Sequence, residues 1–353
     1  MLQISQTLKA AGPALTTAEM SRSKVSRINA YACGICILLF LVLPVSWWGL
    51  RCVEPRFVLT PSDDHNQLVK RRIWEPFAAA YTVATNNRPI RRIKRHEHLE
   101  ANDIVKARSA WKTFLKAIPA PPFAAFRGRG IVISGASFQL NSAFACVKML
   151  RQYGCELPVE LWISAGRGEM PSALEAQLFL ELDVEIRDAD AVALTFPEMK
   201  RQVHLREPDS KPYILKQIAL LSARCRECLL LDADNIPLRN PEYLFEAKEY
   251  LSTGHLLWPD LWRMSRKQAD IRQIFDLPFG GNVTLADERT VESGQMVVDK
   301  GKTWYTLMLA TFIQLQTEFY DLLMREVSYE GGPGMFCLTR GHDVIATQHW
   351  RGR

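Results

Sequence analysis

The chain has 353 residues and a formal net charge of +6 at pH 7. Residues 1–50 carry +3 and residues 51–126 carry +7, so the remaining 227 residues carry about −4. The globular part therefore lacks the basic surface of a nucleic-acid-binding protein, and that class of function is excluded. Its length is sufficient for one α/β domain with a hydrophobic core.

Residues 31–50 predict a membrane span, because this stretch contains no charged residue and covers about 30 Å as a helix. Arg22, Lys24 and Arg27 precede it, and positive charge stays on the cytoplasmic side. Trp47 and Trp48 lie near its end, as in an aromatic belt. We expect a cytoplasmic tail at residues 1–30 and an uncleaved transmembrane signal anchor at residues 31–50. A cleaved signal peptide is the alternative.

Residues 51–126 have the composition of a basic lumenal stem. Runs such as residues 91–95 suit acidic glycans or lipid head groups better than nucleic acid in a lumenal chain. Part of the segment is predicted to be helical, because apolar residues recur near helical spacing. These residues are Ile104, Ala107, Trp111, Phe114 and Leu115. The prolines at residues 119–122 mark a boundary.

From residue 127 onward, predicted strands and helices alternate. Strands are expected at residues 130–134, 159–163, 184–186, 229–231 and 296–298. The helices between them have apolar faces formed by Ala143, Val147 and Leu150, by Leu174 and Leu178 after Pro171, and by Ile214, Ile218 and Leu221 after Pro212. This alternation indicates parallel βαβ units. We therefore expect an α/β domain with a mostly parallel central sheet flanked by helices at residues 127–326.

Two carboxylates, Asp232 and Asp234, stand one residue apart at the end of an apolar strand. Side chains alternate along an extended chain, so both can project the same way and share one hard divalent cation. Ligands of parallel sheets bind at the carboxyl ends of strands, where this pair lies. Such a cation can hold the diphosphate of a nucleotide sugar. A solvated strand-to-turn corner is the alternative.

Glu292 and Gln295 surround a glycine turn before the last predicted strand. They can grip sugar hydroxyls or stabilise charge at the anomeric carbon, so Glu292 is a candidate catalytic residue and Gln295 a candidate substrate-binding residue. Trp258 can stack on a sugar, and Asp260 is a second catalytic candidate. The structural alternatives are a polar turn that caps a strand for Glu292 and a core-filling ring for Trp258.

Gly135 and Lys211 are candidate nucleotide-binding residues. Gly135 follows the first predicted strand, where close backbone approach can admit a base or ribose. Lys211 offers an ammonium charge for phosphate. A plain turn and a solvated residue before a helix are the respective alternatives.

Cys225 and Cys228 lie at a helix-to-strand junction. No second cysteine pair accompanies them, so a local disulfide or two buried thiols are favoured over a metal site.

The chain resembles the fungal Mnn-type α-mannosyltransferases in a series of blocks that occur in the family's order between about residues 127 and 324. The blocks are residues 128–135, 150–160, 211–212, 229–238, 240–245, 258–260 and 292–295. The resemblance implies a GT-A-like nucleotide-sugar-binding fold. It also implies a type II, single-pass Golgi membrane protein whose catalytic domain is lumenal.

The same resemblance implies an α-mannosyltransferase that moves mannose from a GDP-mannose donor. The acceptor is a mannose-terminated glycan of a glycoprotein or of cell-wall mannan, and the α-1,2 linkage is favoured over α-1,3. Manganese is the implied cofactor. Asp232 and Asp234 would then be the ligands of the metal and of the donor diphosphate.

Residues 327–353 are interpreted as a divergent C-terminal tail, because His342 and His349 match no motif of the family. A non-catalytic, truncated relative that retains the nucleotide-sugar fold is therefore one alternative. A haloacid-dehalogenase-like phosphatase is another, since its nucleophile strand also ends in Asp-x-Asp. That family requires Thr or Val two residues beyond the second Asp, where this chain has Ile236.

Overall fold

The computed structural model describes residues 63–86, 90–91, 99–135, 137–167, 170–193, 196–203, 214–263, 268–276, 289–316 and 319–320. The expected tail and span at residues 1–50, Lys211 and the expected C-terminal tail lie outside these ranges. Of the helices described, none has both the length and the apolar character that crossing a bilayer requires.

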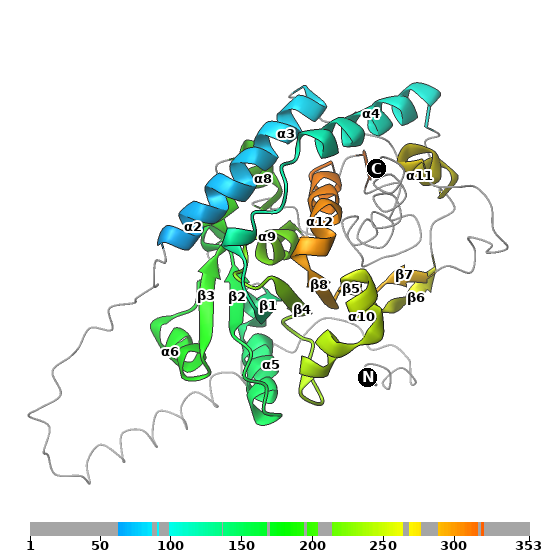
Figure 1. Ribbon diagram of the computed structural model, residues 1–353. Coiled ribbons are helices and arrows are strands. Elements are labelled where there is room, and N and C mark those ends of the chain that lie inside the picture. The colour runs from blue at the N-terminus through cyan, green and yellow to red at the C-terminus, as the bar shows by residue number, and fades with distance from the viewer. Residues whose placement is uncertain are drawn as a thin grey trace, which may run out of the picture. The chain divides into compact units, whose positions relative to one another are not determined.

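A six-stranded sheet forms the centre of the fold, with the strand order β3-β2-β1-β4-β8-β5 (Figure 1). Its strands are β1 (Arg129–Ser134), β2 (Val159–Ile163), β3 (Val184–Asp188), β4 (Glu227–Asp232), β5 (His255–Leu256) and β8 (Gln295–Asp299). The first four are parallel, whereas β8 runs antiparallel to β4 and β5 antiparallel to β8. The mostly parallel sheet expected from the βαβ pattern is confirmed, and β8 is the one described strand of this sheet that runs against the others.

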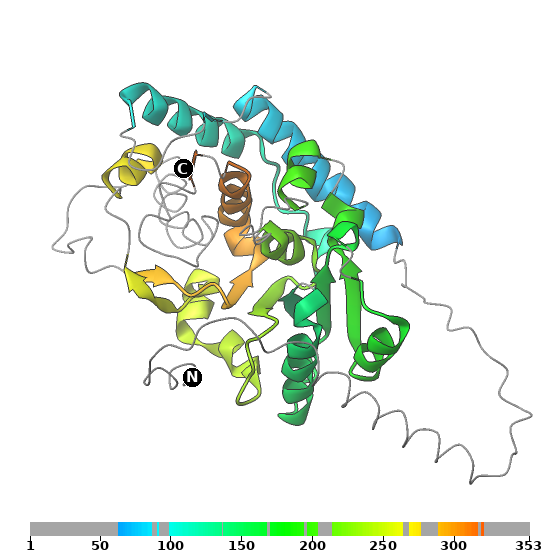
Figure 2. The same cartoon turned by 180° about the vertical axis from the view of Figure 1, so that it is seen from behind.

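Side chains on the two faces of this sheet enter two separate hydrophobic clusters. Val132, Trp162 and Leu230 point to one face, whereas Ile131 and Leu229 point to the other. Helices cover both faces (Figure 2). Those of the first cluster are α2 (Asp63–Val69), α3 (Glu75–Thr85), α4 (Ala101–Ala117), α7 (Ala189–Ala193), α8 (Pro197–Val203), α9 (Ile214–Ser222), α11 (Gln268–Phe275) and α12 (Lys300–Gln314). Those of the second are α5 (Leu140–Gln152), α6 (Ala173–Glu181) and α10 (Lys248–Thr253).

Short elements connect this framework. They are the π-helical turn η1 (Lys70–Trp74), the 3₁₀ turns η2 (Phe123–Ala125), η3 (Ser137–Gln139), η4 (Ala165–Arg167) and η5 (Pro241–Glu246), and a ribbon of β6 (Pro259–Arg263) and β7 (Arg289–Val291). Helix α5 ends at Gln152, and Gly154 follows with a φ of +74°, a left-handed conformation typical of the glycine after a helix. The predicted apolar face of α6 is wrong, because Leu174 is 71% exposed and Leu178 is 38% exposed, and Phe179 supplies the contact to the core instead.

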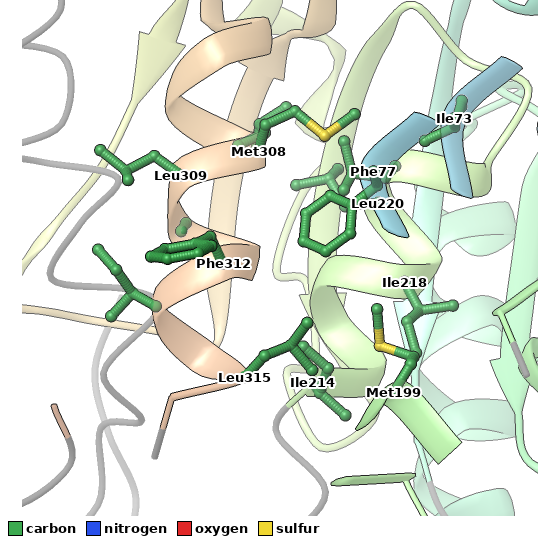
Figure 3. Close-up of a cluster of buried hydrophobic side chains, with 14 of the residues drawn as sticks. Ile73, Phe77, Met199, Ile214, Ile218, Leu220, Met308, Leu309, Phe312 and Leu315 are labelled. Atoms are coloured by element: carbon green, nitrogen blue, oxygen red, sulfur yellow. The ribbon is translucent and has the colours of Figure 1, made fainter. Parts of the chain in front are cut away.

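The segment expected to be a stem contributes helices to the core of the domain. Val69, Ile73 and Phe77 recur four residues apart through α2, η1 and α3, and all three are buried. Ile73 and Phe77 lie in one cluster with Leu220 of α9 and Met308 of α12 (Figure 3). The structure thus differs from a solvated stem between Asp63 and Ala117. The physical reason is that the basic residues between these apolar positions point away from the core and leave an apolar stripe.

Hydrogen bonds join the first helices to the end of the described chain. The Gln316 side chain accepts a hydrogen bond from Ile90 N (2.9 Å) and donates one to Tyr81 Oη (2.5 Å). Trp74 Nε1 donates to Ser222 Oγ (3.0 Å) at the end of α9. His65 is also bonded to Ser222, through Nε2 to the carbonyl oxygen (2.9 Å). Because a carbonyl only accepts, His65 carries its proton on Nε2 here.

A fully buried lysine lies at the edge of the sheet where the parallel strands begin. Lys300 Nζ donates to Ala223 O (2.6 Å) and lies 3.9 Å from the ring centroid of Phe126. Burial lowers the pKa of Lys300 to about 7, although the charge of Glu160 acts in the opposite direction.

Glu160 is itself buried and belongs to an ionic cluster at this edge. Its carboxylate accepts hydrogen bonds from Arg224 N (2.7 Å) and Trp162 Nε1 (3.2 Å), and Arg187 Nε lies 3.5 Å away. Glu185 pairs with both Arg187 and Arg224 at 2.7 Å. These residues come from β2, β3 and the turn before β4, so the cluster fastens that turn to the sheet.

Cys225 and Cys228 form a disulfide in the turn before β4. A local disulfide was one of the two alternatives expected at this junction, the other being two buried thiols.

Candidate functional site

The Asp-x-Asp segment lies at the carboxyl edge of the parallel strands. Strand β4 ends at Asp232, which stands level with Ser134, the last residue of β1. Ala233 is buried and Asp234 is exposed in the turn that follows. The strand alternation that was expected to align the two carboxylates therefore stops at Asp232.

Asp234 is near enough to α5 for its charge to act on Cys146. Desolvation raises the pKa of the Cys146 thiol on α5 to about 12, and the negative charge of Asp234 adds to this effect. Asp232 has the register of Leu230, which points to the face of the sheet covered by α9. The two carboxylates therefore belong to one short turn at the end of β4.

Gly135 is adjacent to this turn. A Cβ atom at Gly135 would lie 3.3 Å from the Cβ of Ala233, which is tighter than ordinary contact. Its backbone N–H donates to Trp162 O (3.2 Å), so the turn after β1 is held between the ends of β2 and β4. The backbone at Gly135 thus lies at the carboxyl edge, next to Ala233.

The glycine turn before β8 meets the same edge, because β8 runs antiparallel to β4 and begins opposite Leu231. Gly294 O accepts hydrogen bonds from Asp232 N (2.7 Å) and from the Asn235 side chain. A Cβ atom at Gly294 would lie 2.8 Å from Asn235 Nδ2, so only glycine fits without movement. The structure therefore brings the Glu292–Gln295 turn directly against Asp232.

Glu292 has a structural contact within this turn. Its Oε1 accepts a hydrogen bond from Gly294 N (2.7 Å), and its own N–H donates to Trp258 O (2.9 Å). This geometry agrees with the polar turn considered as an alternative, and it also fixes the Glu292 carboxylate close to the end of β4. Gln295 is the first residue of β8 and is half-buried.

Trp258 is half-buried and packs against the hydrophobic cluster on the α5 face of the sheet. The core-filling alternative therefore describes its ring contacts. Asp260 lies in β6, which pairs with β7. Strand β7 ends at Val291, one residue before Glu292. The side chain of Asp260 and the whole of Lys211 lie outside the part of the chain that the structure describes.

Lys216 is the site residue that the sequence analysis missed. Its Nζ lies 2.7 Å from Asp232 Oδ1 and 2.8 Å from Oδ2, and it also donates to Ser293 O (3.1 Å) and Ser293 Oγ (3.3 Å). Every other residue of α9 is buried. A single lysine in such an apolar helix must reach either solvent or a carboxylate, and this was the available signal.

A divalent cation fits this site through oxygen ligands. Among the residues with described positions, no three His, Cys, Asp or Glu side chains converge. Magnesium- and manganese-type ions require only one or two carboxylates when substrate phosphates supply further ligands. Asp232 and Asp234 can form this protein part, and the contact with Lys216 shows that the Asp232 carboxylate already attracts a cationic group.

A family model described as "Mannosyltransferase putative" matches residues 128–340. This match begins at the expected domain boundary and extends past residue 326, into the segment interpreted as a divergent tail.

Three curated relatives are fungal. The α-1,2-mannosyltransferase MNN2 of Saccharomyces cerevisiae is 24% identical over 274 residues, covering 67% of this chain and 44% of that protein. The α-1,2-mannosyltransferase MNN26 of Candida albicans is 27% identical over 249 residues, covering 62% of this chain and 32% of that protein. MNN24 of the same organism is 32% identical over 243 residues, covering 60% of this chain and 32% of that protein. The chain thus spans less than half the length of these relatives. The solved mannosyltransferase Ktr4p of S. cerevisiae with GDP aligns at 10% identity and a TM-score of 0.35, over 75% of this chain and 81% of that one, a likeness too low to carry an argument.

Proposed function

The chain belongs to the mannosyltransferase family, which confirms the resemblance, and on this premise we propose that it transfers mannose from GDP-mannose to a mannose residue of a glycan. The observation that carries the proposal is the contact between three segments at the carboxyl edge of the sheet. There the Asp232 turn, Gly135 and the Glu292–Gln295 turn come together from three distant parts of the chain.

We assign the finer features of the reaction by analogy with the relatives. The names of MNN2, MNN26 and MNN24 support an α-1,2 linkage, in glycosylation of proteins or of cell-wall mannan. A GT-A-like donor fold is consistent with the parallel strands β3-β2-β1-β4 and the donor-side carboxylates at their ends. We also propose a Golgi location with residues 31–50 as the anchor, supported by the absence of charge in that stretch.

In the proposed transfer, a hydroxyl of the acceptor mannose forms a new bond to the anomeric carbon of the donor. The bond from this carbon to the diphosphate breaks, GDP leaves with the electron pair, and the hydroxyl proton passes to a base or to solvent. A manganese ion held by Asp232 and Asp234 would neutralise the charge on the leaving diphosphate. Gly135 would let the nucleotide approach the backbone closely.

Glu292 is the proposed residue for the acceptor side. Its Oε1 is held by Gly294 N, which fixes the carboxylate relative to Asp232 before any substrate binds. A carboxylate held in this way can orient the acceptor hydroxyl or stabilise positive charge at the anomeric carbon. Gln295 and Trp258 remain proposed substrate contacts, Asp260 a proposed catalytic residue and Lys211 a proposed phosphate contact.

The test is transfer of mannose from GDP-mannose to an α-mannobioside by the full chain in the presence of manganese. The Asp232→Ala, Asp234→Ala double variant is expected to lose at least about 100-fold in rate, because two ligands of the charge-neutralising ion are removed. Asp64→Ala removes an exposed carboxylate of α2 and is the matched control.

A folded chain that transfers no mannose, or a double variant as active as the Asp64→Ala control, would overturn the proposed function. Linkage analysis of the product distinguishes α-1,2 from α-1,3 transfer.

A further inference from the structure

Lys216 links the donor carboxylate to the acceptor-side turn, and we propose that it keeps a divalent cation from binding Asp232 tightly until the nucleoside diphosphate is present. Lys216 is in this sense a positioning residue that makes binding of the cation and the donor interdependent. The inference rests on the proposed function, because it concerns the cation and the donor of that reaction.

The contacts of Lys216 use its whole hydrogen-bonding capacity. An ammonium has three donors and no acceptor. Here one group of contacts goes to the two Asp232 carboxylate oxygens and the others to the carbonyl and hydroxyl oxygens of Ser293. One full positive charge is therefore matched to the one negative charge of Asp232.

The surroundings strengthen this pairing. The side chain of Lys216 is 11% exposed and that of Asp232 is 26% exposed. Two charges at this separation attract each other more strongly in a partly desolvated site than at the surface. Lys216 also belongs to α9, whose other residues are buried. The helix that carries the ammonium is therefore fixed in the core, and only the side chain can move.

The charges of the site follow from these contacts. Of the two carboxylates proposed to hold the cation, Asp232 has its charge compensated by Lys216. Glu292 adds a negative charge on the neighbouring turn, where its Oε1 is held by Gly294 N. A divalent cation without nucleotide therefore meets, at Asp232, a ligand already paired with an ammonium that repels the cation.

A nucleoside diphosphate changes this balance. Its phosphate oxygens add ligands for the cation and offer a new acceptor for the Lys216 ammonium. The cation and the diphosphate therefore each increase the affinity for the other, as thermodynamic linkage requires.

The measurement is manganese binding to the full 353-residue chain without nucleotide, from the electron paramagnetic resonance signal of free Mn²⁺. Lys216→Met is expected to bind Mn²⁺ at least about tenfold more tightly than the wild type, because the repelling charge is gone. Lys216→Arg, which keeps the charge, is expected to bind as the wild type does. Lys148→Met removes an exposed lysine of α5 and serves as the matched control with wild-type affinity.

The same titration with saturating GDP completes the test. GDP is expected to raise the Mn²⁺ affinity of the wild type by a larger factor than that of Lys216→Met. Lys216→Gln is a second uncharged variant with polar donors, so it carries the test if methionine prevents folding.

Two results would overturn the inference, and they differ in scope. If GDP-dependent Mn²⁺ binding is intact but the uncharged variants bind Mn²⁺ no better than the wild type, this inference alone fails. If no protein binds Mn²⁺ with or without GDP, the metal site of the proposed function fails with it.

Discussion

Replacement of Lys300 by methionine is expected to stabilise the chain at neutral pH, although Lys300 is fully buried. Burial lowers the pKa of Lys300 from 10.5 to about 7. At about 1.4 kcal/mol per pH unit, the folded state therefore disfavours the charged form by about 5 kcal/mol. Methionine has a similar length and no charge to desolvate.

The expected gain is smaller than this penalty, because Lys300 also makes favourable contacts. Its hydrogen bond to Ala223 O contributes about 2 kcal/mol and its position over the Phe126 ring about 1 kcal/mol. Glu160 keeps its hydrogen bonds from Arg224 N and Trp162 Nε1 and is not left without donors. The net expectation for Lys300→Met is a free energy of unfolding about 2 kcal/mol higher at pH 7.

The pH dependence distinguishes this charge effect from simple repacking of the core. The folded pKa lies below the unfolded one, so between pH 7 and 10.5 the unfolded chain binds a proton that the folded chain does not. The free energy of unfolding of the wild type therefore rises with pH in this window, and this gain is lost as the pH falls toward 7. Lys300→Met lacks this rise, and its advantage is expected to vanish by about pH 8.5.

The assay is urea unfolding of the full chain, followed by tryptophan fluorescence at pH 6.5, 7.5 and 9. Lys302→Met, at an exposed position of the same helix, is the control, and its difference from the wild type is expected to be independent of pH. A difference between Lys300→Met and the wild type that stays constant from pH 7 to 9 would refute the reasoning, as would a variant that is less stable at pH 6.5.

Two further predictions concern His65 and Gly294. Desolvation lowers the pKa of His65 from 6.5 to about 4. The contribution of His65 to the free energy of unfolding is therefore complete above pH 6.5 and is lost as the pH falls through 4. Urea unfolding of the wild type should show that the free energy of unfolding falls by about 2 kcal/mol between pH 6.5 and 4.5. His65→Gln keeps a donor for Ser222 O and should not show this decrease. Equal decreases in both proteins would contradict the prediction. Gly294→Ala should lower the free energy of unfolding by about 1–3 kcal/mol and abolish mannose transfer, because its Cβ would displace Asn235. Gly128→Asn is the control, since a Cβ there meets nothing within 4 Å and Asn tolerates a φ of +60°; transfer by Gly294→Ala at the control rate would contradict the expected displacement.

Five strands of the sheet could be predicted from the sequence because each is short, apolar and bounded by turn residues, whereas the two-residue β5 was not predicted. Their order along the chain also placed Asp232 and Gly135 at one edge, since parallel strands share a carboxyl edge. The contact of the Glu292–Gln295 turn with that edge depends on β8 being antiparallel to β4. Periodicity contains no information on strand direction, so this contact required the structure.

Two other features were missed for identifiable reasons. The apolar stripe of Val69, Ile73 and Phe77 was hidden by the basic residues between its members, which dominate the composition of the segment. Lys216 was overlooked because its role depends on a carboxylate 16 residues away and on Ser293, 77 residues away. Neither local propensity nor spacing can specify such a contact.

The hydrogen bonds between the first helices and the end of the described chain also bear on the order of folding. Tyr81 and Ile90 are bonded to Gln316, 235 and 226 residues later, and Trp74 is bonded to Ser222. A chain that emerges from its amino terminus must therefore keep the apolar stripe of α2 and α3 uncovered until α9 and α12 have been synthesised. Contacts of such long sequence separation slow folding and lengthen the exposure of apolar surface. The basic residues beside that stripe then have a second consequence, since like charges on neighbouring nascent chains repel each other during this interval.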